Sequence, residues 1–284
     1  MALVAGGGRG IGRAIAVAYA TAGAHVSVTA RTRAELDETA ELCRSQGAQA
    51  LVVTTDVSNW RAVEALEARV HAELGPIDVL VNAAGVYGPI GPTATVDVET
   101  WARALDVNLT GTFHLCRAVA PRMADRRYGK IVLLGGGGAT APLPSFSSYA
   151  ASKAAVVRLA ETLAVELAPF NVQVNAIAPG LVDTRMQDEV LAAGDAAGPL
   201  INKVRAARES GAGAVPADVA AALAVFLASD ESGNLAGKLI AAPHDSWATW
   251  QSPFDAFNAS SLLTIRRLDP HTVDPIIDQL RRDG

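Results

Sequence analysis

The segment from Val4 to Ala16, VAGGGRGIGRAIA, decides the fold, because it places spaced glycines between a short apolar run and an amphipathic one. Gly6, Gly10 and Gly12 form the pattern G-x-x-x-G-x-G. Glycine lets a backbone turn sharply and approach a ligand, and the first turn of a helix offers free amides and a positive dipole to a phosphate. The segment therefore predicts a strand, a phosphate-binding turn and a helix, the opening unit of a dinucleotide-binding fold.

Short apolar runs alternate with longer segments of helical period along most of the chain, which is typical of a parallel sheet with helices on both faces. Runs such as VSVTA, DVLVNA and KIVLL are predominantly apolar, as expected of strands buried on both faces. We predict strands at residues 2–5, 25–30, 49–54, 77–82, 129–134, 171–177 and 237–242. We predict helices at residues 10–23, 33–46, 59–74, 97–124, 148–168 and 216–228. The expected fold class is α/β, a Rossmann-type doubly wound parallel sheet of about seven strands.

Two regions depart from this alternation. Residues 185–215 are rich in Ala and Gly with weak helical signals, which predicts a mobile loop or lid. Residues 243–284 hold two of the four tryptophans and two of the six phenylalanines, which are either packing anchors or walls of a substrate pocket. The last residues, DPIIDQLRR, resemble a short amphipathic helix. We therefore predict a nucleotide-binding domain at 1–242, which includes the loop at 185–215, and a C-terminal extension at 243–284.

Composition limits the partners and the compartment. The 284 residues carry 24 Lys and Arg against 29 Asp and Glu, a formal net charge of −5, with no basic cluster. Nucleic acids and anionic membranes are bound through basic surfaces, so we expect a small-molecule partner and neither of these. No apolar run approaches the roughly 18 residues of a membrane span and no targeting signal precedes the first strand, so we expect a cytoplasmic protein. Cys43 and Cys116 lack the spacing of a zinc site or a disulfide framework, and we expect no metal.

The end of the second predicted strand indicates which dinucleotide is bound. A site for NAD(H) places a carboxylate there to accept from the ribose hydroxyls. Here the strand is followed by Arg31, and no acidic residue appears before Glu35. Arg31 and Arg9 could together clamp a 2′-phosphate, although Arg31 could also be a solvated residue at a helix start. We predict NADP(H) as the cofactor, with NAD(H) less favoured.

Tyr149 and Lys153 lie four residues apart in a predicted helix, so they share one face. A free phenol has a pKa of about 10 and is a poor base at neutral pH, but a neighbouring ammonium group favours the phenolate. The tyrosine could then take a proton from an alcohol while hydride leaves for a nicotinamide, or return it in the reverse direction.

With these motifs the chain resembles the short-chain dehydrogenase/reductase family over about residues 2–242. The resemblance rests on AGGGRGIG at 5–12, Asp56-Val57, the motif Asn82 to Gly85, Asn108 within DVNLTGTF, the Tyr149-x-x-x-Lys153 pair and NAIAPG at 175–180. It implies cofactor contacts from Gly6, Arg9, Gly10, Ile11, Gly12, Arg31, Asp56, Val57, Asn82, Ala83, Ala84, Gly85, Tyr149, Lys153, Pro179, Gly180, Val182 and Thr184.

The resemblance also implies individual roles. Asp56 contacts the adenine, and Val182 and Thr184 follow the Pro179-Gly180 turn at the nicotinamide. Lys153 holds the nicotinamide ribose, and Asn108 keeps a water that passes protons to bulk solvent. Members of the family are commonly oligomers, so a homodimer or homotetramer is expected.

One family residue is missing from the sequence. The catalytic serine of the family lies thirteen residues before the tyrosine, and this position is Gly136, within IVLLGGGGAT. The serine donates a hydrogen bond to the substrate oxygen, and loss of such a donor typically costs on the order of a hundredfold in rate. Three interpretations stay open: a nearby hydroxyl replaces it, the glycine amides form an anion-binding nest, or catalysis is lost. The candidate hydroxyls are Thr140, Ser145, Ser147 and Ser148, and we take Thr140 as the candidate catalytic residue.

The function expected from the sequence is the interconversion of a secondary alcohol and a ketone on a small organic substrate by an NADP(H)-dependent oxidoreductase. Tyr149 would act as acid and base, assisted by Lys153, Asn108 and Thr140. The alternatives are a redox-neutral enzyme, such as an epimerase or dehydratase, and a non-catalytic nucleotide-binding protein. The sequence does not identify the substrate.

Overall fold

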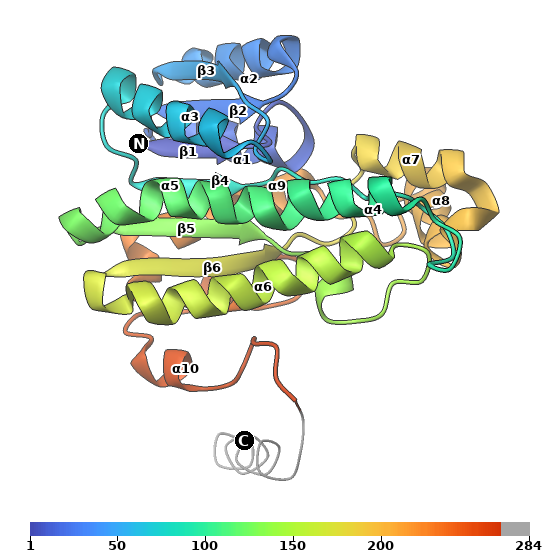
Figure 1. The fold of residues 1–284 in the computed structure, drawn as a ribbon. Helices are drawn as coiled ribbons and strands as arrows, with labels where there is room; N and C mark the ends of the chain where they lie inside the picture. Colours follow the sequence, from blue (N-terminus) through green and yellow to red (C-terminus); the bar gives the residue numbers. More distant parts are fainter. Residues whose placement is uncertain (268–284) are drawn as a thin grey trace.

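The computed structural model describes residues 1–267, which form a single parallel sheet with helices on both faces (Figure 1). The strands are β1 (Ala2–Ala5), β2 (Val26–Ala30), β3 (Ala50–Thr54), β4 (Val79–Asn82), β5 (Gly129–Leu134), β6 (Val172–Ala178) and β7 (Leu239–Ala241). They pair in the order β3-β2-β1-β4-β5-β6-β7. The chain thus builds outward from β1 to one edge and then from β4 to the other, and this reversal opens a crevice at the carboxyl ends of the central strands. The predicted fold class is confirmed.

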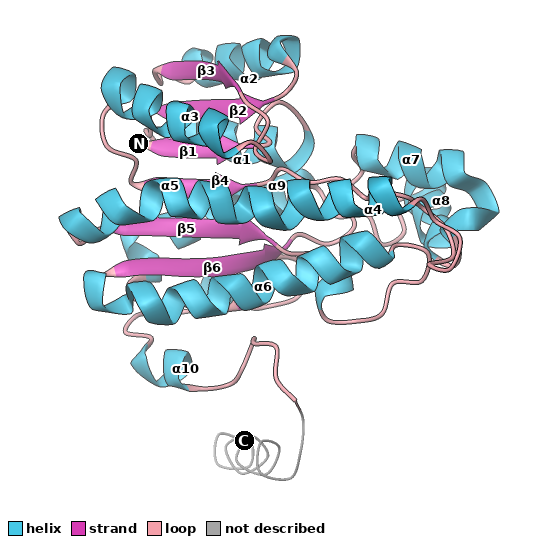
Figure 2. Ribbon diagram, viewed as in Figure 1, coloured by secondary structure: helices cyan, strands magenta, loops and turns pink. Residues whose placement is uncertain are grey.

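Two layers of helices cover the sheet (Figure 2). One face carries α1 (Gly10–Thr21), α2 (Arg33–Ser45) and α9 (Ala217–Ala228); the other carries α3 (Trp60–Leu74), α5 (Gly111–Arg126) and α6 (Ser147–Leu167). Side chains alternate along each strand, so Val4 belongs to the first core cluster while its neighbour Leu3 belongs to the second. The helix predicted at 97–124 is interrupted: α4 (Val98–Leu105) passes through a π-helical turn at Asp106–Thr110 into α5.

The segment 185–215 differs from the prediction of an irregular loop. It forms α7 (Arg185–Ala193) and α8 (Leu200–Ser210), which lie beyond the carboxyl ends of the strands (Figure 1). Val190, Ile201 and Val204 pack with Tyr87 and Phe146 in a third apolar cluster. The sequence does not show a clear helical period in this segment, because its few large apolar residues are separated by alanines and glycines. We call residues 185–210 the lid.

The aromatic residues after β7 pack on the protein's own core. The centroid of the Trp247 ring lies 5.8 Å from that of Phe226 on α9. The centroid of the Trp250 ring lies 5.1 Å from that of Phe257, which lies in α10 (Asp255–Ala259). Phe254 is buried. These residues act as anchors, one of the two roles predicted for them. The helix predicted at DPIIDQLRR lies outside the described residues.

The extension also runs along the edge strand β7. The Leu239 amide donates to the Leu263 carbonyl at 2.7 Å. The Lys238 Nζ donates to the carbonyl oxygens of Ser260 and Leu262 at 2.8 and 3.1 Å, and it lies 4.9 Å from the Phe257 ring centroid. A buried lysine therefore ties the extension to the sheet.

Two further observations concern residues 1–267 as a whole. None of their helices combines the length and the apolar character needed to cross a membrane. Nowhere do they gather three or more His, Cys, Asp or Glu side chains in a way that could hold a metal ion. Cys43 and Cys116 are buried and unpaired, one in each of the two main core clusters.

Candidate cofactor and active site

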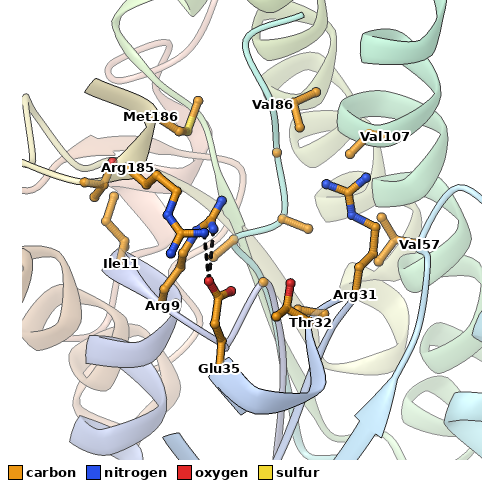
Figure 3. Close-up of a pocket in the computed structure, with 18 of the residues that line it drawn as sticks. Arg9, Ile11, Arg31, Thr32, Glu35, Val57, Val86, Val107, Arg185 and Met186 are labelled. Carbon is orange, nitrogen blue, oxygen red and sulfur yellow. Dashed lines mark hydrogen bonds and ion pairs between the residues drawn. The ribbon is translucent and has the colours of Figure 1, made fainter. Parts of the chain in front are cut away.

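A cavity of about 230 Å³ lies at the carboxyl ends of β1 to β4, where the strand order reverses (Figure 3). The predicted cofactor residues on its wall are Gly6, Arg9, Gly10, Ile11, Gly12, Arg31, Asp56, Val57, Ala83, Ala84, Gly85 and Thr184. Its wall also contains Glu35, Val86, Arg185 and Met186, which we did not predict. The remaining predicted residues, Asn82, Tyr149, Lys153, Pro179, Gly180 and Val182, do not line it.

The glycine turn leaves no room for side chains. A Cβ on Gly12 would lie 2.1 Å from the Gly6 carbonyl oxygen. Gly6 has φ +74°, and a Cβ there would lie 2.5 Å from the Ala84 amide nitrogen. The turn leads directly into α1, whose first amides have no partner within the helix. This arrangement fits the pyrophosphate of a dinucleotide.

Asp56 is held in place at the cavity wall. Its Oδ1 accepts from the Ser58 amide at 3.0 Å and the Ser58 hydroxyl at 2.6 Å, and its Oδ2 pairs with Arg103 at 2.8 Å. Burial acts to raise the pKa of Asp56, but the bonds from Ser58 and the charges of Arg103 and Arg31 outweigh it, so the pKa is lowered. The ionised carboxylate is an acceptor for a ligand in the cavity.

The basic residues stand on two sides of the cavity (Figure 3). Arg31 is exposed and lies on the side of Val57. On the other side, Arg9 Nη1 lies 3.1 Å from Glu35 Oε1, and Arg185 Nη1 lies 2.9 Å from the same oxygen. Both predicted phosphate ligands, Arg9 and Arg31, therefore reach the cavity, but Arg9 is already paired with a carboxylate.

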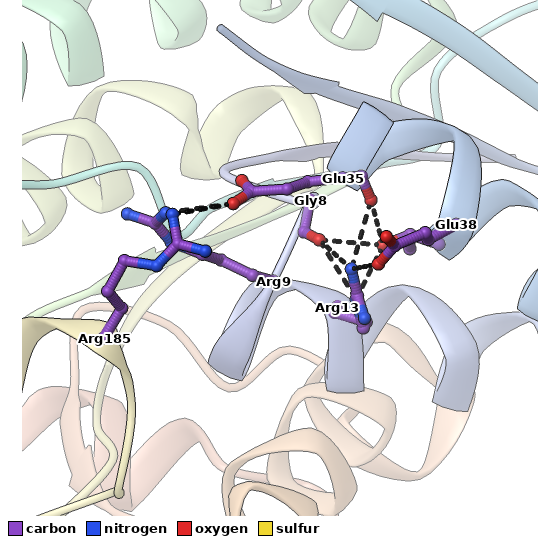
Figure 4. Close-up of polar contacts among 7 residues, drawn as sticks. Gly8, Arg9, Arg13, Glu35, Glu38 and Arg185 are labelled. Atoms are coloured by element: carbon purple, nitrogen blue, oxygen red, sulfur yellow. Dashed lines mark hydrogen bonds and ion pairs between the residues drawn. The ribbon is translucent and has the colours of Figure 1, made fainter. Parts of the chain in front are cut away.

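Arg13 connects the glycine turn to α2 (Figure 4). Its guanidinium donates to the Gly8 carbonyl at 3.0 and 2.6 Å and to Glu38 at 2.8 Å. A further bond of 3.3 Å reaches the Glu35 carbonyl. These contacts fix the start of α2 against the turn, and so fix where the Glu35 side chain enters the cavity.

Tyr149 and Lys153 share one face of α6, as predicted. The Lys153 Nζ donates to the Leu134 carbonyl at 2.7 Å and lies 5.7 Å from the Tyr149 ring centroid. Burial lowers the pKa of Lys153 to about 8. Burial, and secondarily the neighbouring Tyr87, raises the pKa of Tyr149. The phenol is therefore protonated at neutral pH in the protein alone, ready to donate rather than to accept a proton.

Lys153, one of the candidate catalytic pair, adjoins the cofactor cavity at Gly85. A Cβ on this cavity residue would lie 3.6 Å from Lys153 Nζ and 3.3 Å from Asn108 Oδ1. Asn108 lies in the π-helical turn and is 1% exposed. It accepts from the Val86 amide at 2.8 Å and donates to the Val86 carbonyl and the Ser152 hydroxyl, both at 2.9 Å. Asn108 thus braces the cavity wall against α6.

The residue at position 136 lies directly against Tyr149. Gly136 has φ +156°, and a Cβ there would lie 2.8 Å from the Tyr149 hydroxyl oxygen. Among the candidate hydroxyls, Ser148 donates to the Tyr87 carbonyl at 3.0 Å and Ser147 accepts from the Trp101 indole at 3.0 Å. Thr140 is exposed at the end of the 3-10 turn Gly137–Ala139.

Sequence reasoning missed Tyr87, which lies beside Tyr149, and Gln187, which contacts Tyr87. The Tyr87 ring lies edge-on to the Tyr149 ring, 4.9 Å between centroids, and 5.0 Å from the Phe146 ring. Its hydroxyl makes a long contact of 3.5 Å with Gln187 Oε1 on the lid. The position of Tyr87, two residues after the motif Asn82 to Gly85, could have indicated that it lies near the site. No sequence pattern marks Gln187.

Asn82 is likewise a brace rather than a cavity residue. Its amide donates to the Thr112 hydroxyl at 2.7 Å, and its Oδ1 accepts from the Ala84 amide at 3.0 Å. The turn after β4 is thereby held against α5.

Comparison with known proteins agrees with this geometry. Residues 1–194 match the model of the short chain dehydrogenase family. The chain belongs to the short-chain dehydrogenase/reductase family. It is 35% identical over 239 residues to the 2,3-dihydro-2,3-dihydroxybenzoate dehydrogenase of Bacillus subtilis. The alignment covers 83% of this chain and 91% of that protein.

Solved structures of short-chain dehydrogenases have the same fold. A xylitol dehydrogenase bound to NAD⁺ superposes with a TM-score of 0.79 and 29% identity, over 84% of this chain and 96% of that one. An actinorhodin polyketide ketoreductase with NADPH superposes with a TM-score of 0.78 and 30% identity, over 84% of this chain and 94% of that one. Such neighbours thus bind either dinucleotide.

Proposed function

We propose that this short-chain dehydrogenase is an NADP(H)-dependent oxidoreductase that interconverts a secondary alcohol and a ketone on a small organic substrate. The observation that carries the proposal is the position of Lys153. Its ammonium lies beside Tyr149 and against Gly85 on the cavity wall, so the proton-transferring group and the dinucleotide site meet at one point.

The residues of this chain would handle the proton. A bound nicotinamide dinucleotide would accept or supply the hydride. In oxidation, the alcohol O–H proton passes to the Tyr149 oxygen while the C–H electron pair leaves as hydride and the C=O bond forms; in reduction, Tyr149 returns the proton to the carbonyl oxygen. Because burial raises the pKa of Tyr149, the positive charge of Lys153 is needed to favour the phenolate in the oxidative direction.

The preference for NADP(H) rests on Arg31 and Arg9. Arg31 makes no hydrogen bond or ion pair with residues 1–267 and stands at the end of β2, where a ribose is bound in folds of this kind. An arginine fork there suits a 2′-phosphate.

The proposal includes catalysis without the family serine. By the resemblance, Gly136 occupies the position of the family serine. Among the candidate hydroxyls, that of Ser148 already donates to the Tyr87 carbonyl, whereas that of Ser147 accepts from the Trp101 indole and keeps its own proton free among the described residues. We keep Thr140 as the candidate donor to the substrate oxygen, with Ser145 and Ser147 as the remaining candidates. A redox-neutral reaction and a non-catalytic nucleotide-binding protein are the two alternatives that the test must separate.

The test follows the reduced cofactor by absorbance at 340 nm with a panel of small secondary alcohols and ketones. We expect net cofactor turnover in the wild type and none in Tyr149→Phe, with cofactor affinity nearly unchanged in that variant. Product without net turnover would indicate the redox-neutral alternative. Cofactor binding with no product would indicate the non-catalytic one.

We also propose a homo-oligomer. Phe113 on α5, Val165 on α6 and Phe170 are 50%, 77% and 41% exposed on one helical layer. Apolar side chains of this size on neighbouring helices suit a contact with a second copy. Light scattering after size-exclusion chromatography would give the mass, and a monomer would contradict the proposal.

A further inference from the structure

Arg185 is the residue by which the lid reaches the cofactor cavity. It is the first residue of α7 and directly follows Thr184, whose Cγ2 lies 3.1 Å from the position of a Cβ on Gly10. The lid therefore begins against the glycine turn. The Arg185 side chain is 60% exposed and extends along the cavity wall toward Arg9 (Figure 4).

Two guanidinium groups converge on one carboxylate oxygen. Arg9 comes from the glycine turn and Arg185 from the lid, and both reach Glu35 Oε1, at 3.1 and 2.9 Å. Two positive charges share one negative charge, and neither arginine has the two-oxygen partner that its fork suits best. Arg9, Arg185 and Glu35 line the cavity and together carry one net positive charge, whereas Glu189, whose carboxylate interacts electrostatically with Arg9, does not line it.

We propose that Arg185 is a cofactor-binding residue supplied by the lid, and that it exchanges Glu35 for a phosphate group of the dinucleotide. A phosphate offers more oxygen acceptors and more negative charge than the carboxylate, so it can engage both arginines at once. The Arg9 and Arg185 side chains are 45% and 60% exposed, so solvent screens their ion pairs, but the Glu35 side chain is only 16% exposed. The contacts of both arginines with the phosphate therefore have to offset the release of a largely buried carboxylate. A phosphate held between Arg9 and Arg185 ties α7 to the glycine turn, which links closure of the lid to occupancy of the cofactor site.

The inference rests on the proposed function only in taking a nicotinamide dinucleotide as the ligand. Dissociation constants of NADPH and NADH are measured by fluorescence titration of the full chain, for the wild type and for Arg185→Gln. The matched control is Arg205→Gln, an exposed arginine on α8 that does not line the cavity. We expect Arg185→Gln to weaken binding about tenfold and Arg205→Gln to leave it within twofold.

The two cofactors distinguish the two phosphate sources. Weaker binding of NADPH alone assigns Arg185 to the 2′-phosphate, and equally weaker binding of both assigns it to the pyrophosphate. Unchanged binding of both in Arg185→Gln would overturn the proposal and leave Arg185 as a surface partner of Glu35. The proposed function would fail in a different way, because the wild type would then bind cofactor without turning over any alcohol or ketone.

Glu35→Gln tests the exchange itself. This variant keeps the side-chain size and one acceptor oxygen but removes the negative charge that attracts both arginines, so we expect severalfold tighter binding of the phosphate that Arg185 contacts. Weaker binding would show that Glu35 positions the arginines instead of competing for them, and would overturn the exchange. Hydrogen exchange at 185–193 gives a second readout: cofactor should protect these amides in the wild type and less so in Arg185→Gln.

Discussion

The hydroxyl oxygen of Tyr149 lies 2.8 Å from the point that a side-chain carbon on Gly136 would occupy. A real Cβ does not approach an oxygen this closely, so any larger residue at 136 has to displace the phenol. The Tyr149 hydroxyl can therefore occupy its position only because residue 136 is a glycine. We therefore expect a serine introduced there to change the site instead of completing it.

We predict that Gly136→Ser lowers kcat/KM by ~10- to 100-fold, because small misplacements of a reacting group are costly. Gly137→Ser is the matched control, since a Cβ on Gly137 has no atom within 4 Å outside its chain neighbours. Steady-state kinetics on one substrate and cofactor titration of both variants check this. A tenfold gain in Gly136→Ser would instead show that a serine side chain at this position assists the reaction.

Thr140→Ala tests the replacement donor. If this exposed hydroxyl binds the substrate oxygen, its loss should lower kcat by about a hundredfold, the typical effect of removing one such donor. Ser148→Ala is the comparison, because the Ser148 hydroxyl is bonded to the Tyr87 carbonyl and should affect stability more than chemistry. Unchanged kcat in Thr140→Ala would remove Thr140 from the catalytic residues.

Arg31→Asp should reverse the cofactor preference toward NAD(H), because a carboxylate repels a 2′-phosphate and can accept from ribose hydroxyls. Arg117→Asp makes the same change of charge at an exposed position on α5 and should leave the preference unchanged. The measurement is the ratio of the dissociation constants of NADPH and NADH. A wild type that binds NADH at least as tightly as NADPH would show that the NADP(H) assignment is wrong.

Asn108→Ala should lower the free energy of unfolding by about 2 to 3 kcal/mol, since it leaves buried partners in Val86 and Ser152 without their hydrogen bonds. Asn108→Asp keeps the acceptor for the Val86 amide but loses both donors, so it should also destabilise. Urea unfolding gives the energies. If Asn108→Ala loses activity with its stability intact, Asn108 acts on the proton path and not as a brace.

Lys238 should make stability depend on pH. Burial lowers its pKa to about 8 from an ordinary 10.5, so between these values the unfolded chain binds a proton that the folded chain does not. Its contribution to stability therefore rises with pH across this window. Urea unfolding from pH 8 to 10 should show a smaller slope for Lys238→Met than for the wild type or for Lys203→Met, a change at an exposed lysine on α8. Equal slopes would contradict the prediction.

Local patterns were sufficient to predict most of the fold. The strands and the glycine turn are predictable because predominantly apolar runs and the spacing of Gly6, Gly10 and Gly12 can be recognised within a few residues. The helices of the lid were missed because Val190 and Ile201 are buried in a cluster that includes Tyr87 and Phe146, which are distant in the sequence.

In the candidate site, too, sequence patterns predict the residues that lie close together in the sequence but not the contacts between distant segments. Tyr149 and Lys153 stand on one helix, and their pairing follows from its period. The contact of Glu35 with Arg185 joins segments that are far apart in the sequence, and no local pattern indicates it. The long contact of Tyr87 with Gln187 also depends on how the lid packs.

The bond from Leu239 to Leu263 has a consequence for the solution behaviour of the protein. An open strand at the end of a sheet is a template on which strands of other molecules can pair, and such pairing leads to aggregation. Here the chain's own extension occupies the free side of β7, and Lys238 fastens it there. A chain shortened to end at Ala242 would expose this edge together with the surface of Phe226, and we expect it to precipitate even though every residue of the candidate site would still be present.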